Sequence, residues 1–204
     1  MPCYTHMTYT VQICRVGCTE TLIEHMHKYT GNVDDLVDGM TALMVASGQG
    51  HIDTMATLML HGASVDVKGP GGYTALFVAC MRGQKAAVAL LLTSGADPNI
   101  RVGVNHLTPL YVTLFKGHDN GIASLLVGRG ADVHAETCYG VTALWVASAN
   151  GALKAVKTLV RRGASVTCCN SSGKQALAAA CINGHLNVAR FLQLSIRRNR
   201  LESM

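Results

Sequence analysis

The chain has 204 residues, of which 49% are hydrophobic and 14% are charged, and its mean hydropathy is +0.26. This composition is too apolar for a disordered protein, and its most apolar run is interrupted by Thr93, Ser94 and Gly95 well before the roughly 18 residues that a membrane helix needs. The net charge of +5 predicts only a mild preference for acidic partners, because part of it lies in the stretch Ile196–Arg200.

The first 18 residues and the cysteines bear on the location of the protein. Residues 1–18 contain no apolar stretch long enough for a secretory signal, so we expect none. The eight cysteines are scattered along the chain, which is typical of free thiols in a reducing compartment. The predicted location is therefore the cytoplasm, with the nucleus as the alternative.

A five-residue phrase, Gly-x-Thr-Ala-Leu, recurs along the chain. It occurs at Gly39–Leu43, Gly72–Leu76 and Gly140–Leu144, and related versions stand at His106–Leu110 and Gly173–Leu177. The third positions of these five phrases are separated by 33, 34, 34 and 33 residues. A fixed period of this length indicates a solenoid, in which each unit packs on its neighbours.

Each unit predicts two short antiparallel helices followed by a turn. The threonine of the phrase is a good N-cap, and the alanine or proline after it suits the first helical position. A glycine ends this first helix; these glycines are Gly50, Gly83, Gly117, Gly151 and Gly184. Apolar residues at helical spacing then predict the second helix, which ends before a segment rich in turn-forming residues. Helices this short are stable because stacked units bury a shared core.

This pattern resembles the ankyrin repeat, which has about 33 residues and a characteristic Thr-Pro-Leu motif. Only the third copy, at Thr108, keeps that motif unchanged. The resemblance implies an all-α repeat fold, an ankyrin-type solenoid of helix–turn–helix units joined by β-hairpin loops. The four ankyrin-like repeats are expected at residues 38–70, 71–103, 104–136 and 137–169.

The two ends of the chain are expected to differ from the repeats between them. Residues 1–37 resemble a degenerate N-terminal capping repeat, and residues 170–194 a C-terminal capping repeat. In the latter, Gln175 replaces the capping threonine and Gln193 stands where other units are apolar, which suits a unit without a further neighbour. Residues 195–204 are expected to form a basic, disordered tail.

Several features that could indicate chemistry are better explained by the repeat. The glycine-rich segments at residues 69–74 and 171–176 lack the spacing of a phosphate-binding loop. Cys14, Cys18, His25 and His27 match no common zinc site, because the two histidines lie about 200° apart on a helix. No pairing of a nucleophile with a base emerges from the remaining histidines. We therefore expect a protein that is not an enzyme and binds no cofactor, metal or small-molecule substrate.

The resemblance places the binding surface on the hairpin tips and on exposed positions of the first helices. In this sequence those positions carry mainly aromatic residues, methionine and basic residues, which contribute strongly to protein interfaces. The predicted partner-binding residues are Met40, Tyr73, Phe77, Met81, Arg82, Leu107, Tyr111, Phe115, Lys116, Tyr139, Trp145 and Asn150. For Phe77, Tyr111 and Trp145, packing between adjacent repeats is an equally good interpretation.

The sequence thus predicts a monomeric, non-catalytic scaffold or adaptor that binds a segment of one or more partner proteins. One alternative is a substrate-recruiting or regulatory subunit of a larger enzyme complex, such as a ubiquitin ligase or a kinase. A nucleic-acid-associated protein is less favoured, because the positive charge is divided between two sides of the predicted stack. Separately, Asn99 resembles the hairpin asparagine that some cells hydroxylate in ankyrin proteins.

Overall fold

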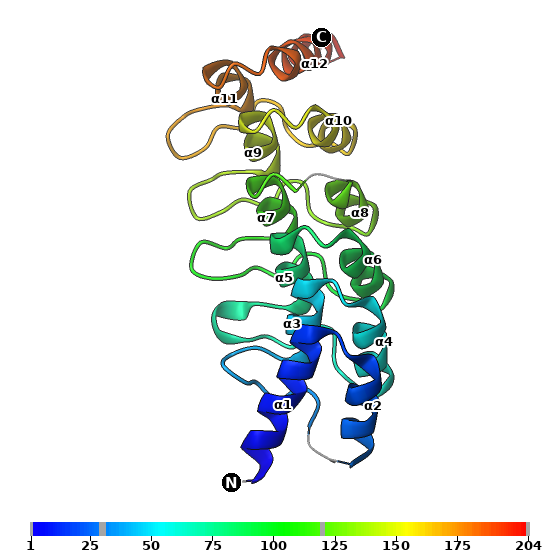
Figure 1. The fold of residues 1–204 in the computed structure, drawn as a ribbon. Coiled ribbons are helices and arrows are strands. Elements are labelled where there is room, and N and C mark those ends of the chain that lie inside the picture. The colour runs from blue at the N-terminus through cyan, green and yellow to red at the C-terminus, as the bar shows by residue number, and fades with distance from the viewer. Residues whose placement is uncertain (1, 29–31, 119–120, 203–204) are drawn as a thin grey trace. The chain divides into compact units, whose positions relative to one another are not determined.

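The structure is a computed structural model that describes residues 2–28, 32–118 and 121–202. These residues form twelve α-helices, one short 3-10 helix and no extended strand, which confirms the predicted all-α repeat fold (Figure 1). None of the helices in the described ranges is both long and apolar enough to cross a bilayer. The chain divides into two compact units, residues 1–100 and residues 101–204.

The unit of residues 1–100 has two layers of helices. The first helices of its repeats pack side by side as α1 (Pro2–Val16), α3 (Ala42–Gln49) and α5 (Ala75–Arg82). The second helices form the other layer as α2 (Thr19–Lys28), α4 (Ile52–Leu60) and α6 (Lys85–Thr93). Leu43, Leu58, Leu76 and Leu91 are at most 1% exposed and form the core between the layers. A 3-10 turn at Pro70–Gly72 lies in the hairpin that precedes α5.

The unit of residues 101–204 repeats this arrangement. Its first helices are α7 (Pro109–Phe115), α9 (Ala143–Ala149) and α11 (Ala176–Ile182), and its second helices are α8 (Ile122–Gly128), α10 (Leu153–Arg161) and α12 (Leu186–Glu202). Within each layer, neighbouring helices pack side by side. Helix α12 runs without a break to Glu202, so residues 195–202 are helical in the structure, where the sequence had suggested a disordered tail.

The N-cap threonines act as the sequence predicts. The hydroxyl groups of Thr41, Thr74, Thr108 and Thr142 each accept a hydrogen bond from the backbone N–H three residues later, at 3.2 or 3.3 Å. Gln175, at the same repeat position, makes no such cap, and its side-chain amide donates instead to the Thr167 carbonyl at 3.1 Å. The four threonines therefore define where the first helices begin.

Side-chain hydrogen bonds tie successive repeats together at the ends of the first helices. His51 Nε2 lies 3.3 Å from the Arg15 carbonyl, and His185 Nε2 lies 3.0 Å from the Ala149 carbonyl. Gln84 occupies the same repeat position as these histidines, and its amide donates to the Gly48 carbonyl at 3.3 Å. These carbonyls belong to the ends of helices, where backbone acceptors lack helical partners. His51 and His185 are thus structural.

Candidate partner-binding surfaces

A groove opens on the first-helix side of the unit of residues 1–100. It has a volume of about 270 Å³, and Arg15, Met40, Met44, Val45, Gly48, Gln49, Val78 and Arg82 line it. Met44, Val45 and Val78 are at most 7% exposed, so they form an apolar floor between α3 and α5. The arginines come from α1 and α5, the first helices on either side of α3. The groove therefore combines an apolar floor with positive charge from both flanking helices.

Gly48 keeps this groove open. It stands at the repeat position that Met81, Phe115, Ala149 and Ile182 occupy in the other units. A Cβ atom on Gly48 would lie 2.9 Å from Cγ1 of Val78, which is closer than side-chain atoms normally approach. Any larger side chain here would both fill the groove and push α3 away from α5.

Among the residues that the structure describes, neither Arg15 nor Arg82 forms an ion pair, and both are exposed. No acidic side chain lines the groove with them. An arginine with no carboxylate partner can form charge-assisted, bidentate hydrogen bonds with the carboxylate of another molecule. The groove therefore matches a segment that carries both apolar and acidic side chains.

The predicted contact residues of this unit fall into two groups. Met40 and Arg82 line the groove, whereas Tyr73 and Met81 lie outside its lining. Phe77 is only 2% exposed, so its side chain belongs to the core rather than to a contact surface. Its ring packs edge-on against Tyr73, with 5.5 Å between ring centroids, and Tyr73 itself is 42% exposed.

In the unit of residues 101–204, α7 carries an exposed aromatic pair. The rings of Tyr111 and Phe115 stack with 5.9 Å between centroids and an interplanar angle of 12°. Phe115 is 58% exposed and the adjacent Lys116 is also exposed, whereas Tyr111 is half-buried. Burial, and to a smaller extent the nearby Cys138 thiol, raise the pKa of Tyr111. This pair with Lys116 is a second candidate surface.

The other predicted contact residues of this unit have mixed surroundings. Leu107 and Trp145 are half-buried, and Tyr139 is 61% exposed at a hairpin tip. Within the described part of the chain, Trp145 Nε1 is buried and has no hydrogen-bond partner. The Asn150 amide donates to the Leu114 carbonyl at 2.7 Å, so Asn150 ties two repeats together. Tyr139 is therefore the exposed aromatic side chain of this group.

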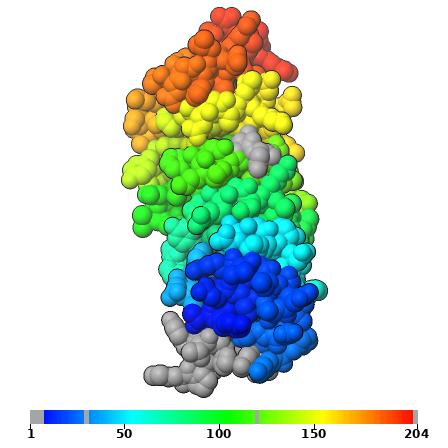
Figure 2. Space-filling view, in the orientation of Figure 1, coloured from blue at the N-terminus to red at the C-terminus, as the bar shows by residue number. Residues whose placement is uncertain are grey.

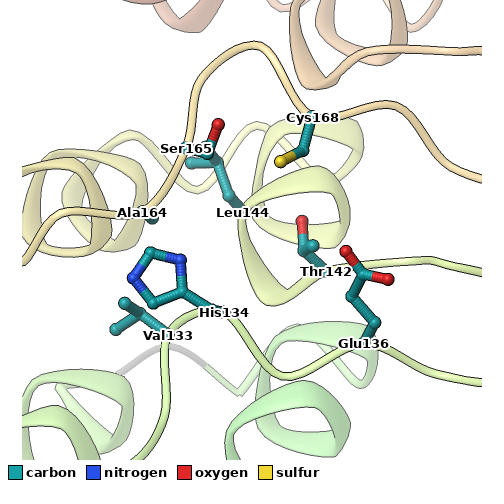
Figure 3. Close-up of a pocket in the computed structure, with 8 residues that line it drawn as sticks. All are labelled: Val133, His134, Glu136, Thr142, Leu144, Ala164, Ser165 and Cys168. Atoms are coloured by element: carbon teal, nitrogen blue, oxygen red, sulfur yellow. The ribbon is translucent and has the colours of Figure 1, made fainter.

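A small pocket beside the hairpins of this unit holds several polar side chains (Figure 3). His134, Glu136, Thr142, Ser165 and Cys168 surround it, and its volume is about 40 Å³. A cavity of this size accommodates only a few water molecules. The side chains come from separate turns and surround the space rather than converge on one point (Figure 3). This pocket is too small to bind a metabolite.

The four residues considered as zinc ligands do not share one environment. Cys14 and His25 are buried, while Cys18 and His27 are exposed, and the described residues contain no cluster of metal-ligating side chains. Burial raises the pKa of the Cys14 thiol to about 12, so Cys14 is a packed, protonated thiol.

Asn99, singled out in the sequence for hydroxylation, is exposed at a turn, where its backbone N–H donates to Asp97 Oδ1 at 2.8 Å. The structure leaves its modification a prediction.

Comparisons with known proteins agree with the repeat architecture. A family described as ankyrin repeats (3 copies) matches residues 10–102 and 110–199. The chain is 30% identical over 159 residues to the ankyrin repeat and KH domain-containing protein mask-1 of Caenorhabditis elegans, which covers 78% of this chain and 6% of the relative. It is also 30% identical over 176 residues to ankyrin repeat and SOCS box protein 16 of Homo sapiens, which covers 82% of this chain and 39% of that protein.

Both relatives are much longer than the region that they share with this chain. The shared region covers less than two fifths of the length of each relative. The matched residues contain most of both layers of helices, the helix-ending glycines, and three of the four N-cap threonines, namely Thr41, Thr74 and Thr142. The chain belongs to the ankyrin repeat family.

Proposed function

We propose that the protein is a non-catalytic protein-interaction module that binds a segment of a partner protein in the groove between α1, α3 and α5. The observation that carries this proposal is the groove itself, whose apolar floor is flanked by Arg15 and Arg82. Membership of the ankyrin repeat family supports a role in protein–protein interaction. The occupant that fits best is an extended or helical segment with apolar side chains and at least one carboxylate.

The test uses charge reversal, because both arginines are exposed and their replacement leaves the core intact. Partners are captured from cell extract with the wild-type protein, identified by mass spectrometry, and the purified partner is then titrated against variants. The double variant Arg15→Glu/Arg82→Glu should weaken binding at least about thirtyfold, as expected for arginines at the centre of an interface. Lys68→Glu/Lys85→Glu is the matched control, since it makes the same charge change at exposed positions of the same unit outside the groove.

Equal loss of affinity in both double variants would contradict the groove, because the effect would then depend on the overall charge of the unit. Unchanged affinity in both would exclude this face of residues 1–100 from the interface. Circular dichroism and thermal unfolding of each variant would establish that the fold is retained.

The aromatic pair of α7 is tested separately, because it belongs to the other unit. Phe115→Ser/Lys116→Ser removes an exposed ring and an exposed charge. If this surface also contacts the partner, the variant should lose about tenfold or more in affinity. Val104→Ser is the control, because Val104 is 87% exposed on a hairpin of the same unit.

A second candidate function is a recruiting subunit of a larger assembly, which the similarity to an ankyrin repeat and SOCS box protein favours. The same groove would then hold the protein that is recruited. Native size in cell extract distinguishes the two proposals. A subunit of an assembly would migrate well above its 21.6 kDa mass with a constant set of companions, whereas a module that acts alone would migrate with its partner only.

A further inference from the structure

The positive charge of the chain is concentrated in its C-terminal half. Residues 101–204 contain twelve lysine and arginine residues and four acidic residues, whereas residues 1–100 contain five and eight. Nine of the twelve lie on or directly after the second helices of this unit: Arg129, Lys154, Lys157, Arg161, Arg162, Arg190, Arg197, Arg198 and Arg200. Since α8, α10 and α12 pack side by side, these residues give one layer a strongly positive potential.

Helix α12 adds apolar surface to this charge. Leu186, Leu194 and Leu201 are 76%, 58% and 75% exposed. Arg190 and Arg197, also exposed, fall between them at intervals of three or four residues. Residues at these intervals share one face of a helix. One exposed strip therefore alternates leucine and arginine over about 22 Å of helix.

The opposite face of α12 holds the helix in place. Val188 and Leu192 are at most 1% exposed and pack against α10 and α11. Lys157 of α10 lies over the Phe191 ring, with Nζ 5.9 Å from the centroid. In the space-filling view the C-terminal residues, in orange and red, are visible at the surface (Figure 2). The leucine and arginine strip thus lies on a helix that is already folded and anchored.

We propose that this strip of α12, with the basic residues of α10 beside it, binds the surface of a bilayer that contains anionic lipids. Leucine side chains on an interfacial helix enter the boundary between headgroups and acyl chains, while arginine side chains reach the lipid phosphates. Stable attachment requires both signals, since either one alone gives weak, reversible binding. α12 presents the two signals on the same strip.

Nucleic acid would use this surface differently. Phosphate contacts require only the basic residues, and single strands also stack on exposed aromatic rings. The one aromatic ring of α12, Phe191, is half-buried beneath Lys157, and the three exposed leucines would contribute nothing to a phosphate backbone. The exposed leucines therefore favour a bilayer over a nucleic acid as the ligand of this surface.

The test is sedimentation of the full chain with vesicles. We expect it to bind vesicles of phosphatidylcholine with roughly one third phosphatidylserine at low ionic strength, and not vesicles of phosphatidylcholine alone. Arg190→Gln/Arg197→Gln should lower the partition coefficient about 25-fold, or about fivefold for each charge. Leu194→Gln/Leu201→Gln should lower it about tenfold or more, although the charge is unchanged.

Two control variants make the same kinds of substitution at positions outside the strip. Val104→Gln removes an exposed apolar side chain of the same unit, and Arg101→Gln/Lys174→Gln removes two exposed charges from it. Val104→Gln should bind anionic vesicles like the wild type, and the charge control should lose less than Arg190→Gln/Arg197→Gln. All substituted residues are exposed, so the variants should fold, and thermal unfolding checks this.

Three results would overturn the proposal. The first is no binding of the wild type to anionic vesicles. The second is full vesicle binding by the leucine variant together with loss of binding by the arginine variant. This would indicate a surface that binds polyanions through charge alone, and fluorescence anisotropy with duplex DNA would then test for nucleic-acid binding. The third is a wild-type dimer in sedimentation velocity that the leucine variant abolishes, which would make the strip a contact between two copies of the chain.

Discussion

The strongest quantitative prediction concerns the N-cap of α5. Thr74 is fully buried, and its Oγ1 atom accepts the backbone N–H of Phe77 at 3.3 Å. Thr74→Val keeps the shape of the side chain but removes the acceptor, so a buried N–H loses its partner. Loss of an N-cap of this kind costs about 1 to 2 kcal/mol of the free energy of unfolding.

The assay is urea unfolding followed by far-UV circular dichroism. With an m-value of about 2 kcal/mol/M, a loss of this size lowers the urea midpoint by about 0.5 to 1 M. Thr74→Ser is the complementary variant, because it keeps the acceptor and removes only a buried methyl group, worth about 0.8 kcal/mol. Gln175→Val is the position control, since Gln175 occupies the same place in its repeat without capping a helix, and the variant loses only an exposed hydrogen bond to the Thr167 carbonyl.

Two results would refute this reasoning. A wild-type midpoint for Thr74→Val would mean that the hydroxyl does not stabilise α5. A Gln175→Val variant as unstable as Thr74→Val would mean that the loss arises from valine at this repeat position and not from the missing cap.

Further predictions concern the buried Cys14 and the half-buried Trp145. Burial raises the pKa of Cys14 to about 12. In native protein at pH 8, iodoacetamide should therefore modify exposed cysteines such as Cys138 and Cys168 but not Cys14. Peptide mass spectrometry would show which cysteines are modified. The folded state holds the Cys14 proton more tightly than the unfolded state does. The thiol should therefore favour folding up to about pH 9 and lose that contribution as the pH rises towards 12. A Cys14→Ala variant should show a weaker fall in stability over the same pH range. Trp145→Phe should change the free energy of unfolding by less than about 1 kcal/mol, because the indole N–H forms no hydrogen bond within the described residues. Trp145→Ala should lower it by about 2 to 4 kcal/mol. Equal losses for the two variants in urea unfolding would mean that the indole N–H has a hydrogen-bond partner.

The period of the sequence determines the local structure of this protein. Thr74 and its equivalents cap helices because a hydroxyl can satisfy an N–H three residues later, and this depends only on neighbouring residues. The 33- or 34-residue spacing then requires that such units stack, since one pair of short helices cannot bury its own apolar side. The fold class, the helix starts and the polar hairpins were therefore predictable without coordinates.

The surfaces depended on tertiary structure, because exposure is set by what packs on each side chain. Both Tyr73 and Phe77 were predicted contact residues, with core packing left open for Phe77. In the structure Tyr73 is 42% exposed and Phe77 only 2%. Arg15 and Arg82 are separated by two repeats and line one groove only because α1, α3 and α5 pack side by side and Gly48 leaves space between them. The sequence by itself determined the repeating unit and its caps. The packing of neighbouring repeats decided which side chains line the groove and which leucines of α12 remain exposed, because each such contact joins residues that lie far apart along the chain.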